Sequence, residues 1–305
     1  MLWVEAFDRK IRDYLPEMKV LDDEPMSAHT SFRIGGIVRR MAFPEDAEQM
    51  ILLVSFAREL GISPLVIGNG TNLLIGDGGT DGLVISTREM NRVTPGNRKG
   101  EIVAQAGASL TRTALFACEN GLTGLEFAHG IPGSVGGGIS MNAGAYGGEL
   151  KDVLTGAAVL FPDEGVKYLN AEELHLAYRH TVITEHPDAV VLYGTFCLQE
   201  GDAAEIKARM DELMERRRTA QPLEYPSAGS FFKRPEGHFA AALIEQAGCK
   251  GMAVGDARVS EKHAGFLINT GHATCADVLA LMEKVQKRVY DAYGIVLEPE
   301  VRIIG

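Results

Sequence analysis

Few cysteines and a shortage of positive charge limit what this chain can be. Its four cysteines stand apart, with no CxxC pair and no metal-ligand spacing, so we expect neither a disulfide framework nor a cysteine-bound metal. Isolated thiols suit a reducing compartment, and we expect a cytoplasmic protein. Lys and Arg number 30 against 41 Asp and Glu, a net charge of −11, which argues against nucleic-acid binding by bulk attraction.

Long apolar runs are also missing. No stretch reaches the ~18 apolar residues that a membrane-spanning helix needs, and the N-terminal residues carry charges throughout, unlike a signal peptide. Helical spacing of the apolar residues near the N-terminus predicts a short amphipathic helix that presents Leu2, Trp3, Phe7, Ile11 and Leu15. The eight histidines show no HExxH-type spacing, so we expect no metal site.

Glycine, in contrast, is abundant. The chain has 35 glycines in 305 residues, above the ~7% that is usual. Ten of them lie between Gly121 and Leu150, in a segment too apolar and too varied to be a flexible linker. We expect these glycines to let the backbone pack closely against something.

Hydrophobic periodicity predicts an α+β protein. The predicted helices cover 45–61 with Gly61 at its C-terminus, 109–121, 202–218, 239–248 and 274–293. The predicted strands cover 83–87, 101–107, 153–161, 189–198 and the C-terminal VRIIG. The charged helix at 202–218 marks the expected boundary between a larger N-terminal unit and a smaller C-terminal one.

Two glycine loops are candidates for binding phosphate. Residues 63–79 (SPLVIGNGTNLLIGDGG) predict a strand, a glycine turn and a second strand, and such a turn exposes N–H groups that suit a pyrophosphate. The loop lacks the third glycine and the following helix of the Rossmann fingerprint, and the chain has no GxxxxGK[ST] motif. A tight β-hairpin turn explains these residues equally well. A second loop, IPGSVGG (131–137), favours a dinucleotide bound in a different manner.

Six motifs in order identify a resemblance over about residues 31–305. They are SFRIGG (31–36), GNGTNLL (68–74), GLEFAHGIPGSVGGGISMNAGAYGGE (124–149), YR (178–179), PSAGSFFKRP (226–235) and LEPEVRIIG (297–305). The chain resembles the UDP-N-acetylenolpyruvoylglucosamine reductases, flavoenzymes that complete UDP-N-acetylmuramic acid for peptidoglycan. Some members of the family have an extra loop after the YR motif. Here only HTVITEHPD (180–188) separates that motif from the next predicted strand, so the chain resembles the shorter second type of this family.

The resemblance implies a domain order and a set of ligands. After an N-terminal helical segment (1–30), we expect a vanillyl-alcohol oxidase-like FAD-binding domain (31–200). A smaller α/β substrate-binding domain (201–305) follows, and its C-terminal strand is expected to return to the active site. The implied ligands are non-covalent FAD, NADPH as reductant and the enolpyruvyl ether of UDP-N-acetylglucosamine as substrate. We expect the protein to be a monomer.

The same resemblance assigns the residues that bind FAD. They are Gly68, Asn69, Gly70, Thr71, Asn72, Leu73, Ile131, Pro132, Gly133, Ser134, Gly137, Asn142, Gly144 and Ala145.

Three residues are implied to be catalytic. Hydride transfer to the vinyl carbon of the substrate leaves an enediolate-like intermediate, and the resemblance assigns its stabilisation to Arg179 and Glu300 and its protonation to Ser230. Each residue has another interpretation. Arg179 could be a surface or ion-paired arginine, Glu300 could pair with Arg302, and a serine after glycine is often a turn residue.

The diphosphate of the substrate needs cations, and the candidates are Arg216, Arg217 and Arg218 at the end of a predicted helix and Lys233 and Arg234 in SFFKRP. Of these we favour Arg217 and Lys233, and Tyr146 could stack on the substrate or form a hydrogen bond with it. Arginines at the end of a helix also complement its dipole, and Tyr146 could instead be a core residue. The chain departs from the family at Ala220, where relatives often carry Lys, and at Cys249, where Leu is common. His263 lies on a well-matched segment, and we expect it to be structural.

Two other functions stay open. An oxidase of a small alcohol or lactone would keep the glycine loops but would not need PSAGSFFKRP or EPEVR. A non-catalytic nucleotide-binding protein is disfavoured by the presence of Arg179, Ser230 and Glu300.

Overall fold

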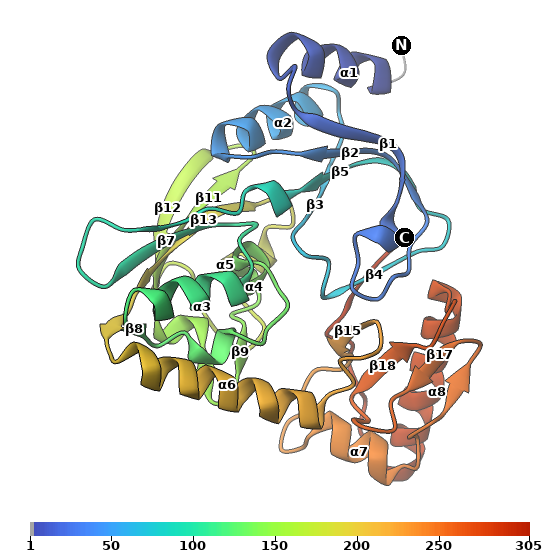
Figure 1. Cartoon of the computed structure of the whole chain (residues 1–305). Helices are drawn as coiled ribbons and strands as arrows, with labels where there is room; N and C mark the ends of the chain where they lie inside the picture. The colour runs from blue at the N-terminus through green and yellow to red at the C-terminus, as the bar shows by residue number, and fades with distance from the viewer. Residues whose placement is uncertain (1–2) are drawn as a thin grey trace. The chain divides into compact units, whose positions relative to one another are not determined.

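The computed structural model describes residues 3–305 (Figure 1), so the predicted helix residue Leu2 lies outside the described part. The chain forms two compact units, each assembled from separate segments. Unit 1 contains the residues up to Asp22, Arg39–Asn69 and Gly82–Glu215, and unit 2 contains Asp23–Val38, Gly70–Asp81 and Arg216–Gly305. These units differ from the expected continuous domains, because two N-terminal segments fold with the C-terminal third of the chain.

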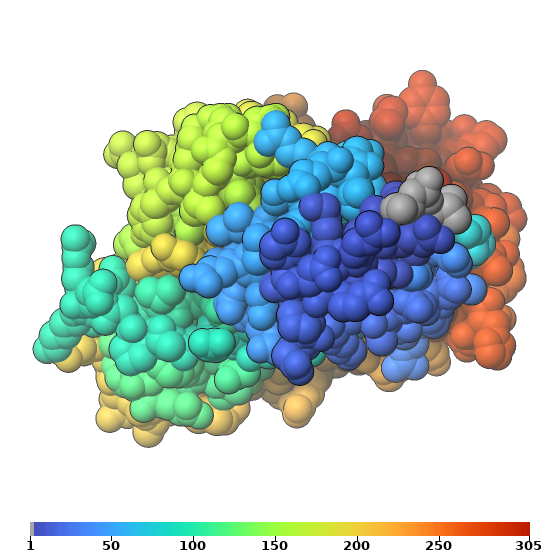
Figure 2. Space-filling view, turned by 90° about the horizontal axis from the view of Figure 1, so that it is seen from above, coloured from blue at the N-terminus to red at the C-terminus, as the bar shows by residue number. Residues whose placement is uncertain are grey.

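The first sheet has the strand order β1-β2-β5-β3. Its elements are β1 (Lys19–Pro25), β2 (Ile37–Phe43), β3 (Leu65–Ile67) and β5 (Thr80–Ser86), with helices α1 (Trp3–Tyr14) and α2 (Ala47–Glu59). The predicted amphipathic helix is confirmed, since α1 buries Phe7 and Ile11 in the core that it shares with α2. Arg40 fixes α1 to β2 through a bidentate pair with Asp8, with distances of 2.9 and 2.8 Å. Figure 2 shows the N-terminal residues in dark blue beside the lighter blue segment that follows them.

The second sheet of unit 1 is antiparallel, in the order β12-β11-β13-β7-β6. Its strands are β6 (Val93–Pro95), β7 (Glu101–Gln105), β11 (Leu154–Phe161), β12 (Gly165–Asn170) and β13 (Val190–Cys197). Helices α3 (Leu110–Glu119) and α4 (Val135–Ser140) lie beside this sheet (Figure 1). A Cβ on Gly194 of β13 would be 2.6 Å from Cδ1 of Ile139, so glycine there lets α4 approach the sheet closely.

Short elements complete unit 1. The strands are β8 (Leu122–Thr123), β9 (Gly144–Ala145), β10 (Gly148–Glu149) and β14 (Gln199–Glu200), and the short helix is α5 (Val182–Glu185). The 3₁₀ turns are η2 (Thr87–Glu89), η3 (Glu126–Ala128) and η4 (Leu150–Asp152). Helix α6 (Ala203–Ala220) begins in unit 1, and its last residues are counted with unit 2.

Unit 2 contains a four-stranded sheet with the order β15-β18-β17-β16. Its elements are β15 (Ser227–Ser230), β16 (Ala253–Val254), β17 (Ala257–Val259), β18 (Phe266–Asn269), α7 (Ala240–Gln246), α8 (Cys275–Tyr293) and the 3₁₀ turn η1 (Met26–Ala28). Its core includes Phe231, Ile244, Leu267, Leu281 and Val285. A separate parallel pair joins β4 (Leu73–Ile75) to β19 (Arg302–Ile304).

The predicted secondary structure holds where periodicity is strong. The expected helices at 45–61, 109–121, 202–218, 239–248 and 274–293 correspond to α2, α3, α6, α7 and α8. The hairpin alternative for the first glycine loop is wrong, because β3 pairs with β5 whereas β4 pairs with β19. Within residues 3–305, no helix is long and apolar enough to cross a membrane.

The N-terminus of α8 is capped from two places in the sequence. Thr274 forms a capping box with Asp277, while the carboxylate of Asp77 accepts the N–H groups of Cys275 and Ala276 at 2.7 and 3.0 Å. The first N–H groups of a helix have no partner within the helix, and a carboxylate there also complements the helix dipole. Asp77 therefore connects the loop after β4 to the largest helix of unit 2.

We predict that Asp77→Ala lowers the free energy of unfolding by about 1–2 kcal/mol, because two N–H groups of α8 lose an ionised acceptor. Urea-induced unfolding followed by circular dichroism measures this change. The control is Asp81→Ala, which removes an exposed carboxylate from the same segment. Equal stability of the two variants would show that the Asp77 cap contributes nothing.

Candidate functional site

The two predicted glycine loops meet in unit 1. Strand β3 ends at Ile67, and a Cβ on the next residue, Gly68, would be only 2.1 Å from Oγ of Ser134. The side-chain amide of Asn69 donates to the carbonyl of Pro132 at 2.9 Å. Residues 68–69 of the first loop therefore lie directly against residues 132–134 of the second, which supports treating them as one site.

The second loop leads into α4, whose three consecutive glycines face different surroundings. Gly136 and Gly138 are buried, and a Cβ on either would be about 3 Å from Ala106 or Leu110. Gly137 is exposed, and its Cβ would be 3.5 Å from Oγ of Ser134. Two of the glycines thus serve packing, while Gly137 leaves open backbone on which a flat or extended ligand can lie.

Asn142 organises the end of α4. Its side-chain amide donates to Glu149 at 2.7 Å and to the carbonyl of Ala177 at 3.3 Å, and its oxygen accepts the N–H of Lys151 at 3.0 Å. The side chain is 1% exposed and its residue has a positive φ of 41°. These internal bonds indicate that Asn142 shapes the loop rather than reaching a ligand with its side chain.

Tyr146 lies on a strained hairpin. Strands β9 and β10 are joined by Tyr146 and Gly147, whose φ angles of 53° and 90° are both positive, as in a type I′ turn. Positive φ is uncommon for a bulky residue and costs of order 1–3 kcal/mol. The hairpin packs closely on Phe127, because a Cβ on Gly148 would be 2.6 Å from that ring. The alternative of Tyr146 as a core residue is wrong, since it is only partly buried.

Arg179 lies in a tight turn that is fixed to α4. Ala177 and His180 exchange backbone hydrogen bonds of 3.0 and 3.2 Å across this turn, and Arg179 has a φ of 55°. The bond from Asn142 to Ala177 holds one side of the turn. On the other side, the buried hydroxyl of Thr181 donates to the carbonyl of Ser140 at 3.0 Å. Arg179 is thus positioned by the same glycine-rich segment that forms the second loop.

Ser230 lies at a β-bulge in unit 2. The pairing of β15 with β18 shifts register between Ser227 and Ser230, and Gly229 between them has a φ of 77°. A bulge with glycine in the left-handed region redirects the side chain that follows it. Ser230 is exposed and belongs to a strand, so the alternative of a simple turn residue is wrong.

Unit 2 brings Ser230 close to Glu300 along the backbone. The N–H of Glu300 donates to the carbonyl of Phe231 at 2.8 Å, and the N–H of Lys233 donates to the carbonyl of Glu298 at 2.8 Å. Residues 230–233 therefore run alongside residues 298–300. Three predicted site residues, Ser230, Lys233 and Glu300, lie on this pair of segments.

Asn72 holds the segment that carries Glu300. Its side-chain amide donates to the carbonyl of Glu300 at 3.1 Å, and its own carbonyl accepts the N–H of Arg302 at 3.0 Å. The side-chain bond joins residues 228 positions apart in the chain. Asn72 was predicted to bind the cofactor, and the structure gives it this additional structural role.

Ser31 is a residue whose role the sequence analysis missed. Its hydroxyl donates to the carbonyl of Ser227 at 2.6 Å, and its N–H donates to the carbonyl of Gly70 at 3.1 Å. Gly70 has a φ of 64°, and a Cβ there would be 2.1 Å from the carbonyl oxygen of His29. Ser31 thus joins the first glycine loop to the strand of Ser230. It is the first residue of the SFRIGG motif, but the motif does not reveal these partners, which lie 39 and 196 positions away in the chain.

The side chains proposed to bind the diphosphate differ in their exposure to solvent. Of the three arginines at 216–218, Arg217 is buried at 9% exposure and its neighbours are exposed. Lys233 is half exposed, and its amine lies 3.3 Å from the carboxylate of Glu298. The position of Arg217 in the last turn of α6 also fits the helix-dipole alternative, which stays open.

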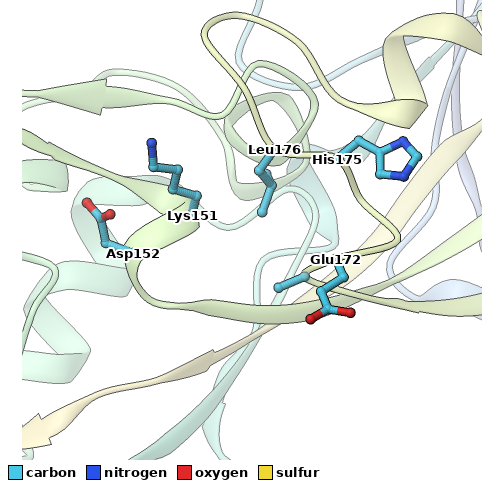
Figure 3. A pocket seen from close by; sticks show the side chains of 6 residues that line it. Lys151, Asp152, Glu172, His175 and Leu176 are labelled. Carbon is cyan, nitrogen blue, oxygen red and sulfur yellow. The ribbon is translucent and has the colours of Figure 1, made fainter.

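A shallow hollow of about 450 Å³ lies elsewhere in unit 1 (Figure 3). It is lined by Lys151, Asp152, Ala171, Glu172, His175 and Leu176, none of which was predicted to be a site residue. In Figure 3 the His175 ring points away from Lys151 and Asp152, so these polar groups do not converge on one ligand position. In the part of the chain that the structure describes, no cluster of His, Cys, Asp or Glu could hold a metal ion.

Comparison with known proteins connects this geometry to a family. Residues 221–304 match the C-terminal domain of UDP-N-acetylenolpyruvoylglucosamine reductase, and residues 38–169 match an FAD binding domain. The expected order of an FAD-binding domain followed by a second domain is therefore confirmed.

Relatives match over nearly the whole chain. The UDP-N-acetylenolpyruvoylglucosamine reductase of Pediococcus pentosaceus is 48% identical over 298 residues, covering 98% of each chain. That of Geobacillus kaustophilus is 48% identical over 302 residues, covering 99% of this chain and 98% of the relative. The crystal structure of the Thermus caldophilus UDP-N-acetylenolpyruvylglucosamine reductase superposes with a TM-score of 0.79 at 33% identity, covering 95% of this chain and 99% of that one. The chain belongs to the UDP-N-acetylenolpyruvoylglucosamine reductase family.

Proposed function

We propose that the chain catalyses the FAD-dependent reduction, by NADPH, of the enolpyruvyl ether of UDP-N-acetylglucosamine to UDP-N-acetylmuramate. The observation that carries this proposal is the pairing in unit 2 that sets Ser230 beside the segment of Glu300. A proton donor and a carboxylate on adjacent segments suit a reaction that ends in protonation of a carbon. The full-length similarity to reductases of that name supports the same function.

The loops of unit 1 fit an FAD molecule. Glycine at 68 lets the first loop pack directly against Ser134, and glycine at 137 leaves backbone exposed beside the same serine. Exposed backbone N–H groups suit the pyrophosphate of a dinucleotide. We assign FAD contacts in this unit to residues 68–69, 131–134, 137 and 144–145. Bound FAD supplies hydride transfer from the reductant to the substrate, and the protein supplies placement and electrostatics.

Three side chains handle the charge and the proton on the substrate. Negative charge develops on the carboxylate of the substrate, and a fixed cation or a proton donor is the usual means of stabilising it; we assign the cation to Arg179 and the proton donor, in its protonated form, to Glu300. The hydroxyl of Ser230 donates the proton to the adjacent carbon. An alcohol is a weak acid near neutrality, so this donation requires a strongly basic carbon, as the enediolate-like intermediate provides.

The nucleotide part of the substrate requires local cations on a chain of net charge −11. We assign diphosphate contacts to Arg217 and Lys233, and a stacking or hydrogen-bonding contact to Tyr146. The strained turn of Tyr146 supports this assignment, because such strain concentrates at ligand sites. We also propose that the protein is a cytoplasmic monomer that binds no nucleic acid. The net negative charge supports the absence of nucleic-acid binding, and the isolated cysteines suit a reducing compartment.

An anaerobic absorbance titration tests the function as a whole. We predict that NADPH bleaches the flavin band of the purified protein and that the enolpyruvyl ether of UDP-N-acetylglucosamine restores it. A protein that bleaches but is restored only by oxygen would instead be an oxidase. A protein that cannot be loaded with FAD would be a non-catalytic binding protein.

Ser230→Ala tests the proton donor. We predict an unchanged rate of flavin reduction by NADPH, and flavin reoxidation by the substrate that is slower by about 10²–10⁴-fold, the usual contribution of a general acid. Stopped-flow absorbance measures both steps. Ser227→Ala, the same change on the same strand, is the control and should reoxidise at the wild-type rate. Equal losses in both steps would contradict the role of Ser230.

Gly137→Val tests the flavin cradle. A side chain at this position has room beside Ser134 but would occupy the open backbone face, so we predict that the Kd for FAD rises by about tenfold or more while the apoprotein melts at an unchanged temperature. Fluorescence titration of the FAD-stripped protein measures this. Gly78→Val, at an exposed glycine with nothing within 4 Å, is the control. Wild-type affinity in Gly137→Val would remove Gly137 from the site.

A further inference from the structure

His263 organises the turn between β17 and β18. The ring nitrogen Nδ1 accepts the N–H of Gly265 at 3.2 Å, and the carbonyl of His263 accepts the N–H of Phe266 at 3.0 Å. The buried hydroxyl oxygen of Ser260 accepts the N–H of His263 at 3.3 Å. The ring also contacts Phe266 edge-on, with 5.0 Å between ring centroids. Backbone, hydroxyl and aromatic contacts together fix the orientation of the imidazole.

Gly265 is closely confined by this imidazole. A Cβ on Gly265 would be 3.1 Å from Cε1 of His263 and 3.2 Å from Cβ of Ala241 on α7. The residue therefore has little space in which to move between the ring and the helix. Its N–H is held by His263, and its carbonyl is turned toward β15.

The carbonyl of Gly265 holds the residue that follows Ser230. It accepts the N–H of Phe231 at 2.8 Å, and that N–H belongs to the peptide group that joins Ser230 to Phe231. Ser230 itself pairs with Phe266, the residue after Gly265. A continuous path of two hydrogen bonds thus runs from the imidazole of His263 to the backbone of Ser230.

We propose that His263 is a positioning residue that sets the hydroxyl of Ser230 by holding Gly265 in place, and that it does so through a hydrogen-bond acceptor at the position of Nδ1. The proposal rests on the proposed role of Ser230 as proton donor. A bulged strand end with glycine at 229 is locally adaptable, so a hydroxyl there needs an external constraint. The Gly265 carbonyl provides that constraint.

The proposal implies a dependence on pH. Burial lowers the pKa of His263 below its ordinary value, and the cation of Lys250 lowers it further. A hydrogen bond to the backbone of His263 and the carboxylate of Glu245 oppose this and raise the pKa in part. The imidazole is therefore neutral at neutral pH. As the pH falls through the pKa of the folded protein, Nδ1 gains a proton and opposes the N–H of Gly265 as a second donor. Lys250 and Glu245 form an ion pair of 2.6 Å with each other.

Two substitutions at position 263 distinguish the effect of losing the hydrogen-bond acceptor from the effect of changing the side-chain volume. His263→Asn keeps an oxygen acceptor near the position of Nδ1, whereas His263→Leu keeps bulk but has no acceptor. In the FAD-loaded full chain, we expect His263→Leu to slow flavin reoxidation by the substrate about tenfold. We expect flavin reduction by NADPH and the substrate Kd to be unchanged, and His263→Asn to stay near the wild-type rate.

A double-mutant cycle tests whether His263 acts through Ser230. We expect His263→Leu to have no further effect on reoxidation in the Ser230→Ala background. Full additivity, or equal losses in reduction and reoxidation, would overturn the proposal and leave His263 a structural residue. If Ser230→Ala alone reoxidises normally, the proposed role of Ser230 fails, which is a different result from failure of the His263 link.

Two further measurements test the proposal even if His263→Leu folds poorly. Hydrogen exchange should be faster in the peptide containing Phe231 for His263→Leu but not for His263→Asn. The wild-type reoxidation rate should also fall on the acid side of neutrality, and His263→Asn should lack this fall. Unchanged exchange of Phe231, or the same acid limb in wild type and His263→Asn, would overturn the proposal.

Discussion

The parallel pairing of β4 with β19 is the constraint on which the arrangement of unit 2 depends. It joins Leu73–Ile75, directly after the first glycine loop, to Arg302–Ile304 at the C-terminus. Asn72 extends the pairing by binding the carbonyl of Glu300, and Glu300 in turn binds the carbonyl of Phe231. The loop, the acid and the strand of Ser230 are therefore linked by a series of hydrogen bonds, one from the side chain of Asn72 and the others between backbone groups.

Much of the fold could be predicted because its helices are encoded locally. Helices α2 and α8 show apolar periodicity, and residues at their ends, such as Asp46, Gly61 and Gly294, cap them in the structure. Strand pairing could not be predicted in the same way, since it depends on contacts between distant residues. The first glycine loop was equally compatible with a hairpin, and only the partners of β3 and β4 exclude one.

The candidate site likewise has features that the sequence could predict and features that it could not. Motif resemblance suggested Arg179, Ser230 and Glu300 as site residues, but it could not explain how each is held. Asn142 and Thr181 hold the turn of Arg179, and a glycine bulge directs Ser230. The supporting residue Ser31 binds a carbonyl 196 positions away, and a single serine gives no sign of such a distant partner. Backbone strain at Tyr146 is likewise visible only as a positive φ, because tyrosine carries no turn signal.

The assembly of unit 2 from three separate segments has a consequence for its biosynthesis. Residues 23–38 and 70–81 leave the ribosome early, yet their partners include Ser227 and the final strand, Arg302–Ile304. The growing chain can order its first sheet and its antiparallel sheet during translation, as N-terminal parts generally do. Asn72 and β4 must instead wait for their partners, Glu300 and β19, which are synthesised last. A chain that lacks its last few residues would therefore leave β4 without its partner strand.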